Sequence, residues 1–248
     1  HKEYRRQRQM CIRDRSSQVH PPSVVTLLQG LTTAADRHGI DVRYHDGSDT
    51  ERSAALAASC DAVVVVAGSS FRDEGEWIIR AGGDRPSLRL AEHHVAMIDA
   101  VAAANPRVAV VLMGGSAFIT DPWLERVAAL AMAWYPGMEG GHAVADVLFG
   151  EVTPSGRLPC TWPTSTTTLP PFRRFARRIT YGPLFGYRMM EATAQRPAFP
   201  FGFGLGYAEL EWTGIRLCSI SEAAEATAAD SSPVRRATFE VEVTNRSD

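Results

Sequence analysis

The sequence predicts an α/β fold, in which an open, mostly parallel sheet carries helices on both faces. Unbroken apolar runs at 62–67, 108–113 and 130–135 are typical of strands that are buried on both faces. Amphipathic segments with helical spacing separate these runs, so the strands should be joined by crossover connections, which parallel strands require. Glycine or proline follows each run closely and marks the loops at the strand ends.

The N-terminal elements follow from local patterns. A helix is expected between Val24 and Gly39, because its apolar residues recur with helical spacing and a glycine ends it. A short strand at Ile40–Tyr44 and an Ala-rich helix at 51–59 should then lead into the strand at 62–67.

The later elements continue the alternation. An amphipathic helix is expected at Leu88–Ala104, where Asn105-Pro106 ends it. A short helix at 121–128 should precede the third long strand, and a further helix at 139–149 should follow it.

Composition excludes several classes of function. The net charge of the 248 residues is −2, which gives no indication of a nucleic-acid partner. No apolar run approaches the roughly 18 residues that a membrane span needs. The four cysteines are scattered and no His lies at metal-ligand spacing, so no metal site is predicted. The glycine-rich loops do not fit a phosphate-binding pattern, so no cofactor is predicted either.

The domain boundaries follow from changes in composition. Residues 1–15 hold six basic and two acidic residues and no apolar segment of a secretory signal, and are expected to be a non-native, disordered leader. The α/β domain is expected at 16–212 and an Ala/Ser/Glu-rich linker at 213–236. The alternating residues that follow predict that 237–248 form the first strand of a truncated β-domain.

A carboxylate-bearing loop follows the strand at 62–67. In open α/β sheets, ligands bind beyond the carboxyl ends of the strands, where this loop should lie. Asp73, Glu74 and Glu76 are close together there, and their repulsion should raise at least one pKa, which suits a proton donor. A solvated acidic turn is the alternative interpretation.

Several motifs resemble family 3 glycoside hydrolases. They cover about residues 16–212 and include an Asp84-Arg85 step into a helix. The others are Trp134-Tyr135-Pro136-Gly137-Met138-Glu139-Gly140-Gly141, Pro154-Ser155-Gly156-Arg157-Leu158-Pro159, Gly186-Tyr187-Arg188 and the stretch Phe199–Tyr207.

The resemblance implies a retaining β-glycosidase, most often a β-glucosidase or a β-xylosidase. In such enzymes an N-terminal (β/α)8 barrel supplies the aspartate nucleophile, and a following α/β sandwich supplies the acid/base glutamate from a loop. Many members add a fibronectin type III-like β-domain. This chain would then correspond to the sandwich and the start of that β-domain, and its substrate to a β-linked oligosaccharide or an aryl or alkyl β-glycoside.

The resemblance also selects the candidate site residues. Glu76 is expected to be the general acid/base, because the family's acid/base residue precedes the Asp-Arg step in a similar Glu-x-Glu context. Glu74 is the runner-up, since the interval between the glutamates and Asp84-Arg85 is longer here than the common pattern. Trp77 could stack on the sugar at the aglycone side or serve as a loop anchor.

The other interpretation is that the chain is a non-catalytic module that folds without performing chemistry on its own. The chain could also form a homo-oligomer. The sequence leaves a cytoplasmic and a secreted or periplasmic location equally open.

Overall fold

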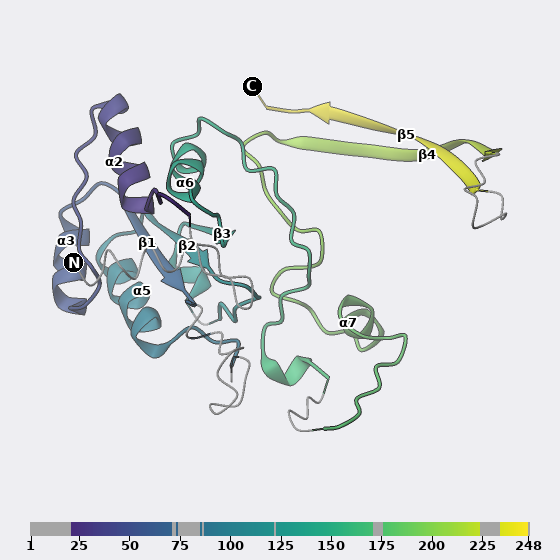
Figure 1. The fold of residues 1–248 in the computed structure, drawn as a ribbon, viewed down its shortest axis with the longest axis horizontal. Helices are drawn as coiled ribbons and strands as arrows, with labels where there is room; N and C mark the ends of the chain where they lie inside the picture. The colour runs from purple at the N-terminus through teal and green to yellow at the C-terminus, as the bar shows by residue number, and fades with distance from the viewer. Residues whose placement is uncertain are drawn as a thin grey trace. The chain divides into compact units, whose positions relative to one another are not determined.

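The computed structural model describes residues 21–70, 73, 85, 87–121, 123–170, 176–223 and 234–247. The chain divides into two compact units (Figure 1). The first, here called the α/β unit, comprises residues 1–152 and 156–204, and the second, the hairpin unit, comprises 153–155 and 205–248. None of the described helices has the length and apolar character that crossing a membrane requires.

The α/β unit contains a three-stranded parallel sheet in the order β1-β2-β3, formed by β1 (Val63–Gly68), β2 (Val108–Met113) and β3 (Ala129–Trp134). These strands match the three predicted apolar runs within one residue. The helical elements are α2 (Leu27–His38), α3 (Thr50–Ala58), α5 (Glu92–Ala104), η2 (Leu124–Arg126), α6 (Gly140–Leu148), η3 (Thr166–Thr168) and α7 (Tyr187–Ala192).

Helices cover both faces of this sheet, as the sequence predicts (Figure 1). Alternate residues of β2 serve opposite faces: Val110 and Leu112 pack with α3 and α5, whereas Val111 and Met113 pack with α2 and α6. All four are fully or almost fully buried. Burial on both faces explains why the strand is an unbroken apolar run rather than an alternating one, and the predicted fold class is confirmed.

Helices α2 and α6 approach each other at two glycines. A Cβ added to Gly30 would lie 2.0 Å from the carbonyl oxygen of Gly141, and one added to Gly141 would lie 2.1 Å from that of Thr26. The backbones are also joined directly, because the Gly141 N–H donates to the Val25 carbonyl at 3.2 Å. Since these neighbours are backbone atoms, no side-chain rotation can make room for a larger residue.

We therefore expect Gly141→Ala to lower the free energy of unfolding by about 1–3 kcal/mol, the usual cost of overpacking, despite the better helix propensity of alanine. Thermal or urea unfolding measures this. Gly182→Ala is the matched control, because a Cβ there meets nothing within 4 Å, and its effect should stay within about 0.5 kcal/mol. Equal effects of the two substitutions would contradict the close helix approach.

Three predicted elements differ from the structure. Ile40–Tyr44 is not a strand, and both of its end residues are about half exposed. Among the described residues of 121–128 only the short 3-10 helix η2 forms, since most bonds there join residues three apart, such as Arg126 N–H to Trp123 O. Helix α5 begins at Glu92 instead of Leu88, because the Leu88 carbonyl accepts a bond from Ile119 N–H at 2.9 Å and holds this segment extended.

The hairpin unit corrects the expected linker at 213–236. Its described residues are mostly strand: β4 (Leu210–Ala223) pairs antiparallel with β5 (Val234–Asn245). Residues 237–245 are therefore part of a second strand rather than a first one. Strand β4 was not predicted, because the segment is rich in Ala, Ser and Glu and the apolar residues of the strand do not alternate regularly.

Two bulges explain that irregular spacing. The register of β4 shifts between Trp212 and Gly214 and again between Leu217 and Ser219. Each bulge absorbs one residue and returns the next apolar side chain to the same face. This apolar face consists of the opposite pairs Trp212 and Val243, Ile215 and Val241, Leu217 and Phe239, and Ile220 and Ala237.

The described residues leave the apolar face of the hairpin exposed: Ile215 is 72% and Trp212 66% exposed. Because a surface of this kind promotes association, we expect the isolated chain to self-associate at high concentration. Ile215→Lys should reduce the association and Thr238→Lys, on the opposite polar face, should not. Light scattering checks this, and a monomer at the highest attainable concentration would contradict it.

Candidate active site at the carboxyl edge of the sheet

The three parallel strands end at one edge of the sheet, where their loops gather. Ser69 and Ser70 follow β1, Gly114 to Ser116 follow β2, and Tyr135 to Gly137 follow β3. Ligands of open α/β folds bind at this edge, so it is the candidate site.

Backbone hydrogen bonds tie the three strand ends together. The Ser69 N–H donates to the Met113 carbonyl at 2.8 Å, and the Gly114 N–H donates to the Trp134 carbonyl at 3.2 Å. Gly68 makes the first of these contacts possible, because its φ is +149° and a Cβ there would lie 1.8 Å from the Met113 carbonyl oxygen. The edge is therefore a connected backbone framework for the loops that leave it.

Trp134 is held in an unusual conformation at this edge. Its φ of +53° lies in the left-handed region, which bulky residues rarely adopt. The register between β2 and β3 shifts at the same place, so that Met113 pairs with Trp134. Strained residues of this kind cost about 1–3 kcal/mol and occur preferentially at functional sites.

The loop after β1 begins with a hydrogen-bonded turn. Both the N–H and the hydroxyl of Ser70 donate to Asp73 Oδ2 at 2.7 Å, and the Asp73 N–H donates back to the Ser70 carbonyl at 2.9 Å. Asp73 is the one member of the predicted carboxylate trio that the structure describes.

Arg85 lies beyond the same loop and contacts the segment that follows β2. Its Nη1 donates to Ser116 Oγ at 2.8 Å and its Nε to the Ser87 carbonyl at 3.2 Å. The guanidinium carbon lies 4.4 Å from the centre of the buried Phe118 ring, a cation–π contact.

The other predicted site residues, Glu76, Glu74 and Trp77, lie outside the described residues, as does Asp84. Sequence reasoning did not identify Ser70 and Ser116 as partners of Asp73 and Arg85. Serine within two or three residues of a strand end, next to glycine, was the available indication, because such residues form local turns. In the described part of the chain, no group of three or more His, Cys, Asp or Glu residues could hold a metal ion.

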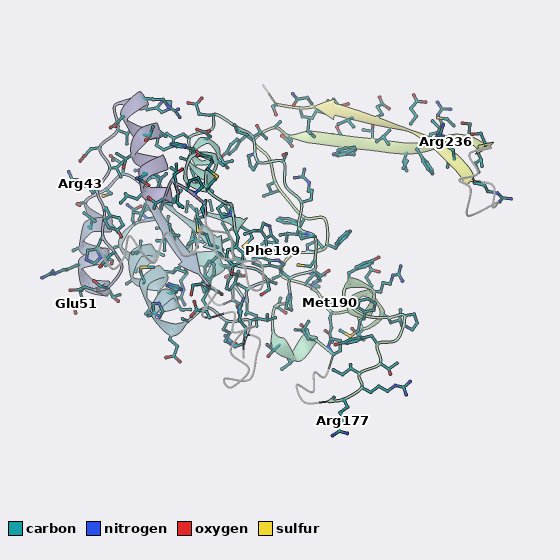
Figure 2. All side chains as sticks on the ribbon, in the orientation of Figure 1. Arg43, Glu51, Arg177, Met190, Phe199 and Arg236 are labelled. Atoms are coloured by element: carbon teal, nitrogen blue, oxygen red, sulfur yellow. The ribbon has the colours of Figure 1, made fainter. Side chains whose placement is uncertain are left out.

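The segment around Trp162 packs on the motif Phe199–Tyr207 beside the sheet. The Trp162 N–H donates to the Phe199 carbonyl at 2.8 Å, and the two rings meet edge to face with centres 5.8 Å apart. Figure 2 shows Phe199 lying within the α/β unit. The buried Trp162 also contacts Phe118, which in turn supports Arg85. Trp162 and Phe199 therefore extend the core next to the candidate site.

The thiols of this unit are partly covered. Cys60 and Cys160 are free and half-buried, in agreement with the absence of a cysteine pair in the sequence. Burial raises the pKa of the Cys160 thiol, which keeps it in the protonated, unreactive form.

Sequence comparison identifies the family. The profile described as "Glycosyl hydrolase family 3 C-terminal domain" matches residues 5–207. The chain belongs to glycosyl hydrolase family 3. The match begins within the segment 1–15 and ends just before β4.

Curated relatives named as β-glucosidases agree with this family. A β-glucosidase of Rhizobium radiobacter is 39% identical over 199 residues, which are 77% of this chain and 24% of that enzyme. A β-glucosidase of Kluyveromyces marxianus is 37% identical over 178 residues, 70% of this chain and 20% of the relative. The chain thus spans about a quarter of the length of the curated relatives that it matches.

Solved structures show the same fold. A β-glucosidase of Chaetomella raphigera superposes with a TM-score of 0.80 at 26% identity, covering 93% of this chain and 33% of the other. A family 3 β-glucosidase of Bifidobacterium adolescentis superposes with a TM-score of 0.70 at 25% identity, covering 94% and 39%. The resemblance inferred from the motifs is therefore confirmed.

Proposed function

We propose that this chain is the acid/base-bearing part of a retaining β-glycosidase, specifically a β-glucosidase, that hydrolyses terminal β-D-glycosyl residues. Its substrates would be β-linked oligosaccharides or aryl and alkyl β-glycosides. The observation that carries the proposal is the carboxylate-bearing segment that leaves the carboxyl end of β1 in a family 3 domain. The β-glucosidase names of the relatives support the choice of glucose. A β-xylosidase of the same family is the alternative.

Retaining hydrolysis divides the work between two carboxyl groups about 5–5.5 Å apart. In the proposed enzyme an aspartate of an N-terminal barrel attacks the anomeric carbon, while Glu76 donates a proton to the leaving oxygen. Glu76 then takes a proton from the water that hydrolyses the glycosyl-enzyme. Glu74 is the second candidate for this role, and Trp77 would line the aglycone side of the cleft.

Desolvation explains why a glutamate would serve as the acid. A carboxyl group enclosed between this edge of the sheet and a barrel would lose water contacts and face the negative nucleophile. Both effects raise a carboxyl pKa and keep the proton in place near neutral pH.

The hairpin unit fits the start of the β-domain that many members of the family carry. Its strands carry an apolar face that the described residues of the unit leave exposed, and a two-stranded sheet is marginally stable by itself. We interpret β4 and β5 as strands of a fibronectin type III-like β-domain.

A gain-of-function experiment tests the proposal. In the chimeric enzyme, this chain replaces the matching segment of the Rhizobium radiobacter β-glucosidase, whose remaining length would supply the barrel. We expect the chimeric enzyme to hydrolyse aryl β-glucosides, and the same enzyme lacking the segment to be inactive. A folded chimeric enzyme that hydrolyses neither glucosides nor xylosides would contradict the proposed function.

A further inference from the structure

The C-terminal part of the α/β unit carries an exposed group of apolar side chains, here called the aromatic surface. Each of its members is between 40% and 58% exposed: Ile179, Tyr181, Leu184, Phe185, Tyr187 and Phe201. Single exposed apolar side chains are common on proteins, whereas a group of them in mutual contact marks an interaction site.

The rings of this surface gather in pairs. Tyr181 and Phe185 have ring centres 6.0 Å apart, and Tyr187 stacks on Phe201 with centres 5.7 Å apart and an angle of 22° between the planes. The guanidinium of Arg188 lies 5.8 Å from the centre of the Tyr187 ring, a cation–π contact. Because one residue alone separates Phe185 from Tyr187 in the chain, the two pairs are neighbours.

The segment that carries these rings is packed on the α/β unit. Met190 of helix α7 is 2% exposed, and the ring of Phe199 meets the buried Trp162. Directly after Phe201, the Gly202 N–H donates to the Leu158 carbonyl at 2.8 Å. A folded segment therefore presents the aromatic surface, and the described residues leave this surface uncovered.

The composition of residues 176–204 is that of a protein interface. They include six aromatic residues and four arginines, no lysine, and Glu191 as the one acidic residue, which gives a net charge of +3. Interface cores are enriched in aromatic residues, Met and Arg and depleted in Lys, Glu and Asp. All four arginines are exposed: Arg177, Arg178, Arg188 and Arg196. A partner face that carries carboxylates would complement them.

A second copy of the chain fits this surface poorly. In a twofold dimer the same surface lies on both partners, so the arginines of one copy would approach those of the other. Like charges brought together in this way disfavour association.

The relatives favour a partner within the same polypeptide. The matched segment makes up 24% of the Rhizobium radiobacter β-glucosidase, so most of an enzyme of that length lies outside this segment. The family profile, which ends at residue 207, includes the whole aromatic surface. The surface is therefore a feature of the family domain rather than of the hairpin that follows.

We propose that this domain docks through the aromatic surface against the preceding, barrel-bearing part of the same enzyme, whose face is apolar at its centre and carries carboxylates opposite the arginines. This inference rests on the function proposed above. Two carboxyl groups on different domains stay about 5–5.5 Å apart only if the domains are held rigidly. Domains of one chain move relative to each other unless their interface is large and hydrophobic.

Hydroxyl-radical footprinting of the isolated chain and of the folded chimeric enzyme tests the docking. Tyr181, Phe185 and Tyr187 should be oxidised about five- to tenfold more slowly in the chimeric enzyme, because an interface core withdraws side chains from water. Tyr44, which is 46% exposed between α2 and α3, is the internal control and should react equally in both. A chimeric enzyme that ends at Asp248 should show the same protection.

The contribution of charge is measured in the same way. In the chimeric enzyme, the double substitution Arg177→Glu and Arg178→Glu should return the oxidation of Tyr181 and Phe185 toward the rate in the isolated chain, because it would place like charges at the interface. Arg43→Glu is the matched control, since Arg43 is exposed elsewhere in the unit, and it should leave the protection unchanged.

Three results would overturn the proposal. Equal oxidation in the chain and the chimeric enzyme would show that the barrel does not cover the surface. Protection that grows with the concentration of the isolated chain would identify a second copy as the partner. Protection lost in the chimeric enzyme that ends at Asp248 would identify the region that follows. Because oxidation does not depend on catalysis, an inactive chimeric enzyme with a protected surface would contradict the proposed function and leave the docking intact.

Discussion

The isolated 248-residue chain is expected to show no measurable turnover of aryl β-glucosides. In the proposed mechanism the nucleophile lies on a barrel, and a proton donor alone cannot form the glycosyl-enzyme. Steady-state assays of the purified chain, beside the chimeric enzyme at equal molar concentration, measure this difference. Robust turnover by the chain alone would show that it contains a complete active site, and would contradict the proposed division of the two carboxyl groups.

In the chimeric enzyme, Glu76→Ala should lower the hydrolysis of substrates with poor leaving groups by about 10²- to 10⁴-fold, the usual contribution of general acid–base catalysis. The first step with dinitrophenyl β-glucoside should remain much faster, and the glycosyl-enzyme should accumulate, because no base activates the attacking water. Rapid-mixing kinetics with both substrates provide the measurement.

Glu74→Ala is the matched control for this prediction and should have a far smaller effect. The reverse result, with Glu74→Ala as the leaving-group-dependent variant, would move the acid/base assignment by two residues. If both variants behave like the unmodified chimeric enzyme, the segment 74–84 does not supply the acid/base residue.

The parallel sheet could be predicted from the sequence, because strands that are buried on both faces are apolar at every position. Every residue of β2 from Val110 to Met113 packs against one helical layer or the other, so the strand is apolar throughout. The end of helix α2 was predictable for a similarly local reason: Gly39 adopts the left-handed conformation that ends the helix, with φ of +66°.

The elements that were predicted wrongly depend on partners distant in sequence or on shifts of register. Leu88 looked like the start of a helix, but its carbonyl is engaged by Ile119 N–H. In β4 the bulges near Thr213 and Cys218 hide the alternation that would have revealed a strand.

The same distinction applies to the candidate site. That an acidic segment follows β1 could be read from the sequence, because it is a property of one short segment, and Asp73 is the member that the structure describes. The contact of Arg85 with Ser116 and Phe118 joins residues about thirty positions apart and required the fold. The left-handed Trp134 also has no sequence signature, because bulky residues seldom adopt this conformation, and it coincides with the shift of register between β2 and β3.

The central claim is that this chain supplies the acid/base glutamate. The product formed in the presence of azide tests this claim most directly. Azide can attack the accumulated glycosyl-enzyme without help from a base. With dinitrophenyl β-glucoside as substrate, the Glu76→Ala chimeric enzyme is therefore expected to turn over faster in azide and to release β-glucosyl azide, identified by NMR. If only free glucose forms and azide leaves the rate unchanged in both the Glu76→Ala and the Glu74→Ala enzymes, the acid/base residue does not lie in this segment.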